Sequence, residues 1–212
     1  MSNRYARILA AGGAAVLVAA LGVTTAWAAA TTKTWTIQPG GAIKAASTRF
    51  AFTDTTTGNV TVCRSSAASG TLKSGSGLPG SDAGSLSAVS ILTCSGAAGP
   101  RYTLQPGGLP WHVNFSSYNA TKGVARGTVS HMHIAVTGTG CTAILDGTGA
   151  TADDGHVTFK YTDSTGQLKV LTTGGNLHFY DVAGCLGIFD SGDPATLSVT
   201  YTVTPQQSIT SP

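Results

Sequence analysis

The sequence contains no glutamate and has little charge of either sign. Charged residues make up 10% of its 212 residues, against about 25% in an average soluble domain. Strong helix formers such as glutamate, lysine and arginine are therefore scarce, which argues against a helical bundle, a coiled coil or a doubly wound α/β enzyme. A hydrophobic fraction of 42% with a net charge of only +3 argues against disorder.

Small and β-branched residues are abundant, whereas charged residues and strong helix formers are scarce. The chain has 32 threonines, 28 glycines and 20 serines, which together exceed a third of its length. Glycine and threonine disfavour helices, and threonine is enriched in strands. The composition therefore predicts an all-β protein with many turns.

Residues 1–28 have the three parts of a secretory signal peptide. Arg4 and Arg7 form a basic start, an uncharged apolar run follows from residue 8 to about residue 23, and Ala26-Trp27-Ala28 is a small-x-small site. The apolar run is short for a membrane span of about 20 residues, so an uncleaved anchor is the less favoured alternative. We expect cleavage after Ala28 and a secreted, extracellular protein.

Removal of this leader would leave a nearly neutral chain. The formal net charge falls to +1, and the remaining lysines and arginines form no cluster. A neutral surface argues against nucleic acid as a partner and against electrostatic binding to a membrane surface. No second apolar stretch reaches the length of a span. We therefore expect no membrane contact after signal cleavage.

Four cysteines follow the predicted leader, and an even number in an exported chain indicates disulfides. Three connectivities are possible. We favour the sequential one, because each bond would then hold one half of the chain together. Close pairs of the C-x2-C type, which a cysteine zinc site needs, are absent. The four residues are Cys63, Cys94, Cys141 and Cys185.

Short alternating runs separated by Gly, Ser, Asn, Asp and Pro recur through the rest of the chain. In residues 156–161, for example, Val157, Phe159 and Tyr161 alternate with polar residues. Such runs are typical of antiparallel strands joined by turns. About ten to twelve strands are expected, enough for a β-sandwich or, as the alternative, a flattened β-barrel.

The domain organisation expected from these patterns is simple. Residues 29–205 would form a single β-sandwich domain, and residues 206–212 a flexible C-terminal tail. Residues 64–85 are rich in glycine and serine, so we expect a long mobile loop there.

The usual catalytic signatures are missing from the sequence. It contains no G-x-S-x-G elbow, H-E-x-x-H helix, phosphate-binding loop or dinucleotide fingerprint. The absence of glutamate also removes the commonest acid/base residue of sugar hydrolysis, although an aspartate pair could substitute. We expect no enzyme activity and no cofactor.

His131-Met132-His133 is the best candidate for metal binding. Residues two apart on a strand project to the same face about 7 Å apart, so both imidazoles could reach one ion. A zinc site would need a third ligand from the fold, for which three further histidines are available. The simpler interpretation, which we favour, is two polar residues on the outer face of a strand. The available histidines are His112, His156 and His178.

Two aspartate-glycine segments could bind calcium through carboxylate and carbonyl oxygens. They are Asp153-Asp154-Gly155 and Asp190-Ser191-Gly192-Asp193-Pro194. Aspartate and glycine are also the ordinary residues of turns, and neither segment matches the twelve-residue EF-hand loop. We expect turns at both places.

Several short patterns together resemble a group of small secreted β-rich proteins of uncharacterised function from high-GC Gram-positive bacteria. The resemblance covers most of residues 60–205 and implies export and β structure, but it carries no catalytic residues to transfer. The patterns are Gly108-Leu109-Pro110-Trp111, Gly140-Cys141-Thr142-Ala143, Gly184-Cys185-Leu186-Gly187, Gly192-Asp193-Pro194-Ala195-Thr196 and Thr200-Tyr201-Thr202-Val203-Thr204-Pro205.

Three functions are compatible with the sequence. The favoured one is a non-enzymatic, disulfide-bonded structural or binding protein of the extracellular space or cell envelope, whose partner would be an envelope component or another protein. The first alternative is a secreted metal-dependent or aspartate-based hydrolase that uses His131 and His133. The second alternative is a secreted protease inhibitor, which would present a rigid loop held by a disulfide.

Overall fold

Strands paired in antiparallel fashion dominate the computed structural model, which describes residues 33–96 and 99–212. The signal peptide predicted over residues 1–28 lies outside the described residues. No helix long and apolar enough to cross a bilayer occurs in the described part of the chain. The strands are β1 Thr34–Gln38, β2 Gly41–Ser47, β3 Phe50–Asp54, β4 Val60–Leu72, β5 Gly75–Pro79, β6 Gly84–Gly96, β7 Arg101–Gly107, β8 Trp111–Asn119, β9 Val124–Gly138, β10 Cys141–Asp146, β11 Gly155–Thr162, β12 Gln167–Val170, β13 His178–Ala183, β14 Ala195–Thr204 and β15 Ser208–Thr210.

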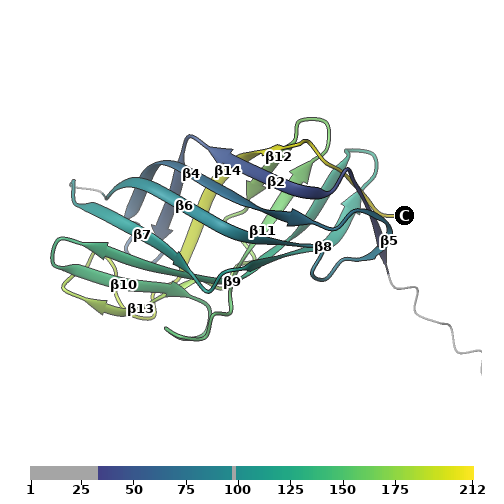
Figure 1. The fold of residues 1–212 in the computed structure, drawn as a ribbon. Helices are drawn as coiled ribbons and strands as arrows, with labels where there is room; N and C mark the ends of the chain where they lie inside the picture. Colours follow the sequence, from purple (N-terminus) through teal and green to yellow (C-terminus); the bar gives the residue numbers. More distant parts are fainter. Residues whose placement is uncertain (1–32, 97–98) are drawn as a thin grey trace, which may run out of the picture. The chain divides into compact units, whose positions relative to one another are not determined.

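Eight of these strands close into a barrel (Figure 1). The circuit of neighbours runs β2, β4, β6, β8, β9, β11, β12 and β14, and β14 pairs again with β2. The closing pair has the register Thr202↔Ala46. Closure leaves none of these eight strands at an open edge.

Four further strands extend this barrel along its strands. Strand β3 continues the line of β2, β7 that of β8, β10 that of β11, and β13 that of β12. Each of these four strands pairs with the same long neighbours as the barrel strand it continues, or with the next extension strand. The long strands β4, β6, β9 and β14 run through both parts. Where two short strands meet along one line, the chain leaves the sheet in a loop, and two such breaks flank β9: residues 108–110 and residues 147–154.

The inside of the barrel is apolar because inward and outward residues alternate along each strand. In β11, Val157, Phe159 and Tyr161 are buried while the residues between them are half-exposed. One end is covered by the sheet β15-β1-β5, whose Trp35 packs on Phe115 with ring centroids 5.2 Å apart. In the extension, Phe179 stacks on Phe189 of the loop that follows β13.

The all-β prediction is confirmed, and of the two architectures considered the barrel is the one observed. The mobile loop expected at residues 64–85 was wrong, because β4 continues to Leu72, β5 follows, and β6 begins at Gly84. In β4, two of the three serines and the glycine pair with residues of both β2 and β6. The flexible tail expected at residues 206–212 was also wrong for β15, which pairs with β1 and buries Ile209.

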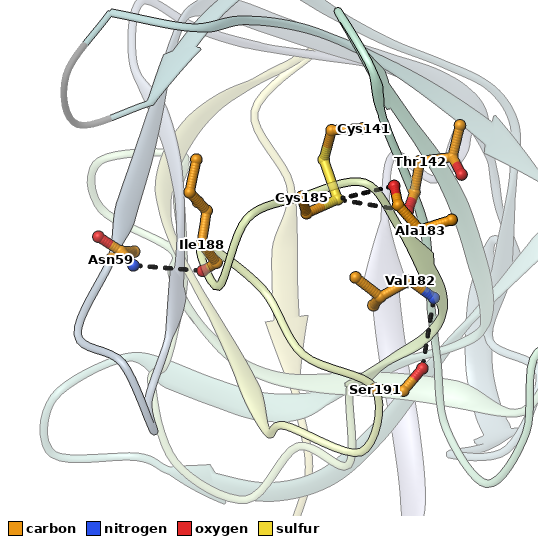
Figure 2. Close-up of a disulfide and its surroundings, with 8 residues drawn as sticks. All are labelled: Asn59, Cys141, Thr142, Val182, Ala183, Cys185, Ile188 and Ser191. Atoms are coloured by element: carbon orange, nitrogen blue, oxygen red, sulfur yellow. Dashed lines mark hydrogen bonds between the residues drawn. A yellow bond between two sulfur atoms is a disulfide. The ribbon is translucent and has the colours of Figure 1, made fainter.

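The sequential disulfides are confirmed. Cys63 and Cys94 lie directly opposite each other on β4 and β6, with 3.9 Å between their Cα atoms. Cys141 of β10 is joined to Cys185, at the start of the loop that follows β13 (Figure 2). Two disulfides are typical of extracellular proteins, since the cytosol keeps thiols reduced.

Candidate functional site

The two histidines of the H-x-H segment lie at a bulge in β9. His131 has a left-handed backbone (φ 63°), and the register with β11 shifts at this point. A β-bulge inserts one extra residue and re-aims the side chains around it. The two imidazoles consequently make contacts in two different polar clusters, which the strict alternation assumed in the sequence did not predict.

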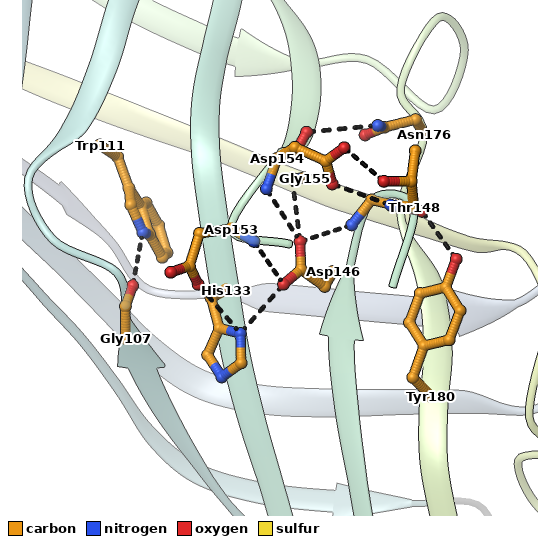
Figure 3. A network of polar contacts seen from close by, with 11 residues as sticks. Gly107, Trp111, His133, Asp146, Thr148, Asp153, Asp154, Gly155, Asn176 and Tyr180 are labelled. Atoms are coloured by element: carbon orange, nitrogen blue, oxygen red, sulfur yellow. Dashed lines mark hydrogen bonds and ion pairs between the residues drawn. The ribbon is translucent and has the colours of Figure 1, made fainter. Parts of the chain in front are cut away.

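His133 contacts two aspartates from the break between β10 and β11 (Figure 3). Its Nδ1 lies 3.0 Å from Asp146 Oδ2 and 3.3 Å from Asp153 Oδ1. An ionised carboxylate can only accept hydrogen bonds, so Nδ1 carries a proton. The arrangement orients His133 firmly and leaves its Nε2 without a hydrogen-bond partner among the described residues.

Asp146 is completely buried and serves as the acceptor for the loop that follows it. Its Oδ1 accepts the backbone N–H groups of Gly147 (2.6 Å), Asp154 (3.1 Å) and Gly155 (3.1 Å), and its Oδ2 accepts that of Asp153 (3.0 Å). A carboxylate has about four lone-pair positions. Asp146 therefore holds both ends of residues 147–154 against the barrel.

A second set of bonds completes this loop. The Asp154 carboxylate accepts the backbone N–H of Thr148 (2.8 Å) and its hydroxyl (2.6 Å), and these bonds lower the pKa of Asp154. Asn176 donates from Nδ2 to the Asp154 carbonyl, and Tyr180 donates its hydroxyl to the Gly147 carbonyl (Figure 3). Residues 147–154 are therefore also held by Asn176, which lies between β12 and β13, and by Tyr180 of β13.

His131 belongs to a separate, more exposed cluster. Its ring lies 4.4 Å from that of His112, centroid to centroid, and His112 Nδ1 lies 2.6 Å from Asp82 Oδ1. The hydrogen bond from His112 lowers the pKa of Asp82. Of the three histidines considered as a further ligand, His112 therefore approaches His131 and not His133.

We expect His112→Ala to raise the pKa of Asp82 toward its ordinary value. Because the folded-state pKa is the lower one, the pair contributes stability above the ordinary pKa of aspartate, and that contribution is lost as the pH falls through the folded-state value. Carboxyl carbon chemical shifts followed through a pH titration by NMR would measure the change. An unaltered midpoint for Asp82 would contradict the assignment, and His178→Ala is the control.

The two remaining histidines do not join either cluster. His156 is the second residue of β11, and its backbone N–H donates to Asn176 Oδ1 (2.7 Å). His178 Nδ1 lies 2.8 Å from the carbonyl of Asn176. No hydroxyl or thiol of the described residues hydrogen-bonds His133, so the structure shows no partner that His133 could activate as a nucleophile.

The interior of the barrel contains an apolar cavity of about 90 Å3. Ala45, Ala68, Met132 and Val157 contribute to its wall, and Ile209 of the end sheet does so as well. This cavity could not be inferred from the sequence. The inward alternation was visible, but which strands face one another depends on the closure of the barrel.

The polar groups in the cavity wall are already paired within the protein. Tyr201 bonds Ser66 through its hydroxyl (2.8 Å), and the hydroxyl of Tyr161 donates to the Gln207 carbonyl (3.0 Å). The Gln207 amide accepts from Gly40 N–H (2.9 Å) and donates to a backbone carbonyl (2.8 Å). A buried water needs two to four polar partners, and this wall offers none that is free.

Comparison with known proteins leaves the function to be argued from the chain itself. No protein-family model, curated protein or solved structure matches it. Asp146 is the residue of the site that sequence analysis missed. The available signal was an aspartate directly after the apolar run Ala143-Ile144-Leu145, at the end of a strand.

Proposed function

We propose that the protein is an exported, non-enzymatic binding protein whose ligand is a small apolar compound held inside the barrel. The observation that carries this proposal is the cavity of about 90 Å3, whose polar wall groups are all satisfied by the protein. Eight-stranded barrels have an interior just large enough to be filled by side chains or to hold one small ligand. The two disulfides suit a carrier that works outside the cell.

The free-energy cost of leaving the cavity empty favours a bound ligand. An unfilled cavity costs about 24 cal/mol per Å3, so about 90 Å3 costs roughly 2 kcal/mol. That is a large fraction of the 5–15 kcal/mol by which a typical domain is stable. A bound apolar molecule would recover this loss by restoring the missing van der Waals contacts.

The size of the cavity limits the ligand and its affinity. It is smaller than the roughly 150 Å3 cavity that admits benzene in an engineered protein, so compounds of about five non-hydrogen atoms are the expected class. At the ceiling of about 1.5 kcal/mol per atom, such a compound binds no more tightly than a few micromolar. We expect it to bind through shape and apolar contact alone.

The protease-inhibitor alternative needs an exposed loop, and the loop present here has an unsuitable backbone. Leu186 follows the disulfide-bonded Cys185 and is 96% exposed, so an apolar side chain is indeed presented on a stapled loop. Its backbone, however, has φ of 53°. A substrate-like segment that adds as a strand to a protease requires an extended backbone with negative φ.

Filling the cavity from its wall tests the proposal. Ala68→Val places two additional methyl groups into the cavity, and we expect it to raise the free energy of unfolding by about 1 kcal/mol and to abolish ligand-induced stabilisation. The measurement is a set of thermal melts with and without xenon or dissolved short-chain hydrocarbons, for the disulfide-bonded exported protein.

The matched control is Ala67→Val on the same strand. Ala67 is exposed on the outer face, so the substitution adds the same methyl groups and the same strand preference without entering the barrel. It should keep the full response to the apolar compounds. Equal responses in both variants, or no response in the unaltered protein, would argue against a ligand inside the barrel.

A further inference from the structure

We propose that His133, Asp146 and Asp153 form a binding site for one zinc ion on the outer side of β9. The site is separate from the apolar cavity, and its occupancy does not depend on the function proposed above. One nitrogen and two carboxylate oxygens, all within 4.8 Å of one another, converge here from β9, from the end of β10 and from the loop after it. These three side chains could supply three of the four ligands of a tetrahedral zinc ion.

The distances between the ligand atoms suit a tetrahedral ion. Zinc bonds of 2.0–2.1 Å to nitrogen and oxygen place neighbouring ligand atoms about 3.3–3.4 Å apart. His133 Nδ1 lies 3.3 Å from Asp153 Oδ1 and 3.0 Å from Asp146 Oδ2. An ion could therefore enter with only small side-chain movements.

The hydrogen bonds of Asp146 leave one of its oxygens available. Three backbone N–H groups saturate Oδ1, whereas Oδ2 accepts only the N–H of Asp153 and the proton of His133. Zinc would take the place of that histidine proton. The proton would move to Nε2, which points away from both carboxylates (Figure 3), so the neutral imidazole would bind zinc through Nδ1.

The local charge favours a cation. Asp146 is fully buried, Asp153 lies beside it, and no lysine or arginine of the described residues forms an ion pair with either carboxylate. Their only cationic partner is His133, which carries at most one charge. A divalent ion balances both carboxylates, and the 54% exposure of the Asp153 side chain leaves room for water as the fourth ligand.

The ligand types favour zinc over calcium. Calcium takes six to eight oxygen ligands, whereas this site offers two carboxylates and an imidazole nitrogen, a set that suits zinc. The bonds that fix Asp146 to the loop backbone orient a ligand in the way that outer hydrogen bonds do in established zinc sites. The contacts around Asp153 also differ from those of an ordinary turn, because its carboxylate faces His133 rather than its own backbone.

The experiment is a calorimetric titration of the disulfide-bonded exported protein with zinc chloride, after treatment with a chelator. We expect saturable binding of one ion. Asp153→Asn keeps the size of the side chain but weakens it as a ligand, so the affinity should fall by about tenfold or more. Because Asp153 is exposed and makes no other side-chain bond among the described residues, this variant should fold normally.

The control is Asp181→Asn. Asp181 is also exposed and has nearly the same left-handed backbone (φ 48° against 50° for Asp153), so this variant loses the same charge in the same conformation. It should bind zinc as the unaltered protein does. His131→Gln should do so too, since His131 lies in the other cluster.

Nitrogen NMR of the imidazoles provides a second readout. Zinc should convert His133 from the form with a proton on Nδ1 to the form with a proton on Nε2. The proposal is overturned if zinc shows no saturable binding, if Asp153→Asn binds as tightly as Asp181→Asn, or if binding is lost in His131→Gln. The last result would place the ion at His112 and His131 instead.

Discussion

Asp146→Ala is expected to lower the free energy of unfolding by about 3–5 kcal/mol. The substitution removes the acceptor of four backbone N–H groups and the nearer of the two carboxylates that contact His133 Nδ1, in a position with no exposed surface. Buried donors without an acceptor cost about 1–3 kcal/mol each, reduced where water can enter, and removing one partner of a buried charge pair costs a similar total. Urea denaturation in the presence of a chelator measures the change without any contribution from metal.

The neighbouring Asp154→Ala is the control for this prediction. Its carboxylate is exposed and bonds only Thr148, so we expect a loss of at most about 1 kcal/mol. Similar losses for the two variants would show that Asp146 is not the residue that holds residues 147–154 to the barrel. Hydrogen exchange of the Gly155 amide should rise strongly in the Asp146 variant only.

Removal of the Cys141–Cys185 disulfide is the second change with a large expected effect. Replacing both cysteines by serine frees a loop of 44 residues in the unfolded chain, which costs about 4 kcal/mol in loop-closure entropy. Denaturant unfolding of the double variant should show this loss together with a steeper slope, because the unfolded chain without the cross-link exposes more surface. The same calculation gives nearly the same loss for Cys63–Cys94, whose separation is 31 residues.

The two disulfides should differ in their local effects. Cys63 and Cys94 join strands that are already paired along their whole length, whereas Cys185 begins a loop without such a ladder. That loop is otherwise held by a few bonds, among them those from Asn59 to Ile188 O and from Val182 N–H to Ser191 Oγ (Figure 2). Limited proteolysis should therefore cut near Leu186 only when Cys141 and Cys185 are replaced. Equal cleavage in both variants would contradict this difference.

The strand content was predictable because it depends on local pattern. In residues 156–161 the alternation of Val157, Phe159 and Tyr161 with polar residues matches the observed burial. Local pattern gave the wrong prediction for residues 64–85, because glycine and serine indicate a loop whether or not neighbouring strands are available to pair with. Here β2 and β6 supply the partners for β4, and a strand forms despite its low intrinsic preference.

The closure of the barrel and the end sheet depend on contacts between distant parts of the chain. The polar stretch around Gln207 indicates a tail, but its side chain is buried and bonded to Gly40 and its backbone to Tyr161. A pairing such as Thr202↔Ala46 leaves no mark in either segment alone. The sequence therefore predicted the fold class, with the barrel only as an alternative to the sandwich.

The candidate metal residues show the same limit at the level of a single residue. Strict alternation predicted that His131 and His133 share one face, but the bulge at His131 separates their contacts. The partners of His133 are aspartates that the sequence placed in a turn, as Asp153, or did not single out, as Asp146. A bulge depends on the pairing of β9 with β11, so its position could not be inferred from β9 alone.

Met132 offers the most direct measurement of the central claim, that the barrel interior binds a small apolar compound. It is the only methionine after residue 1, and its side chain lines the cavity. In protein labelled at the methionine methyl group, NMR should show a saturable shift of the Met132 signal with xenon or a short-chain hydrocarbon, retained in Ala67→Val and lost in Ala68→Val. A Met132 signal that does not move, or that moves equally in both variants, would contradict the account.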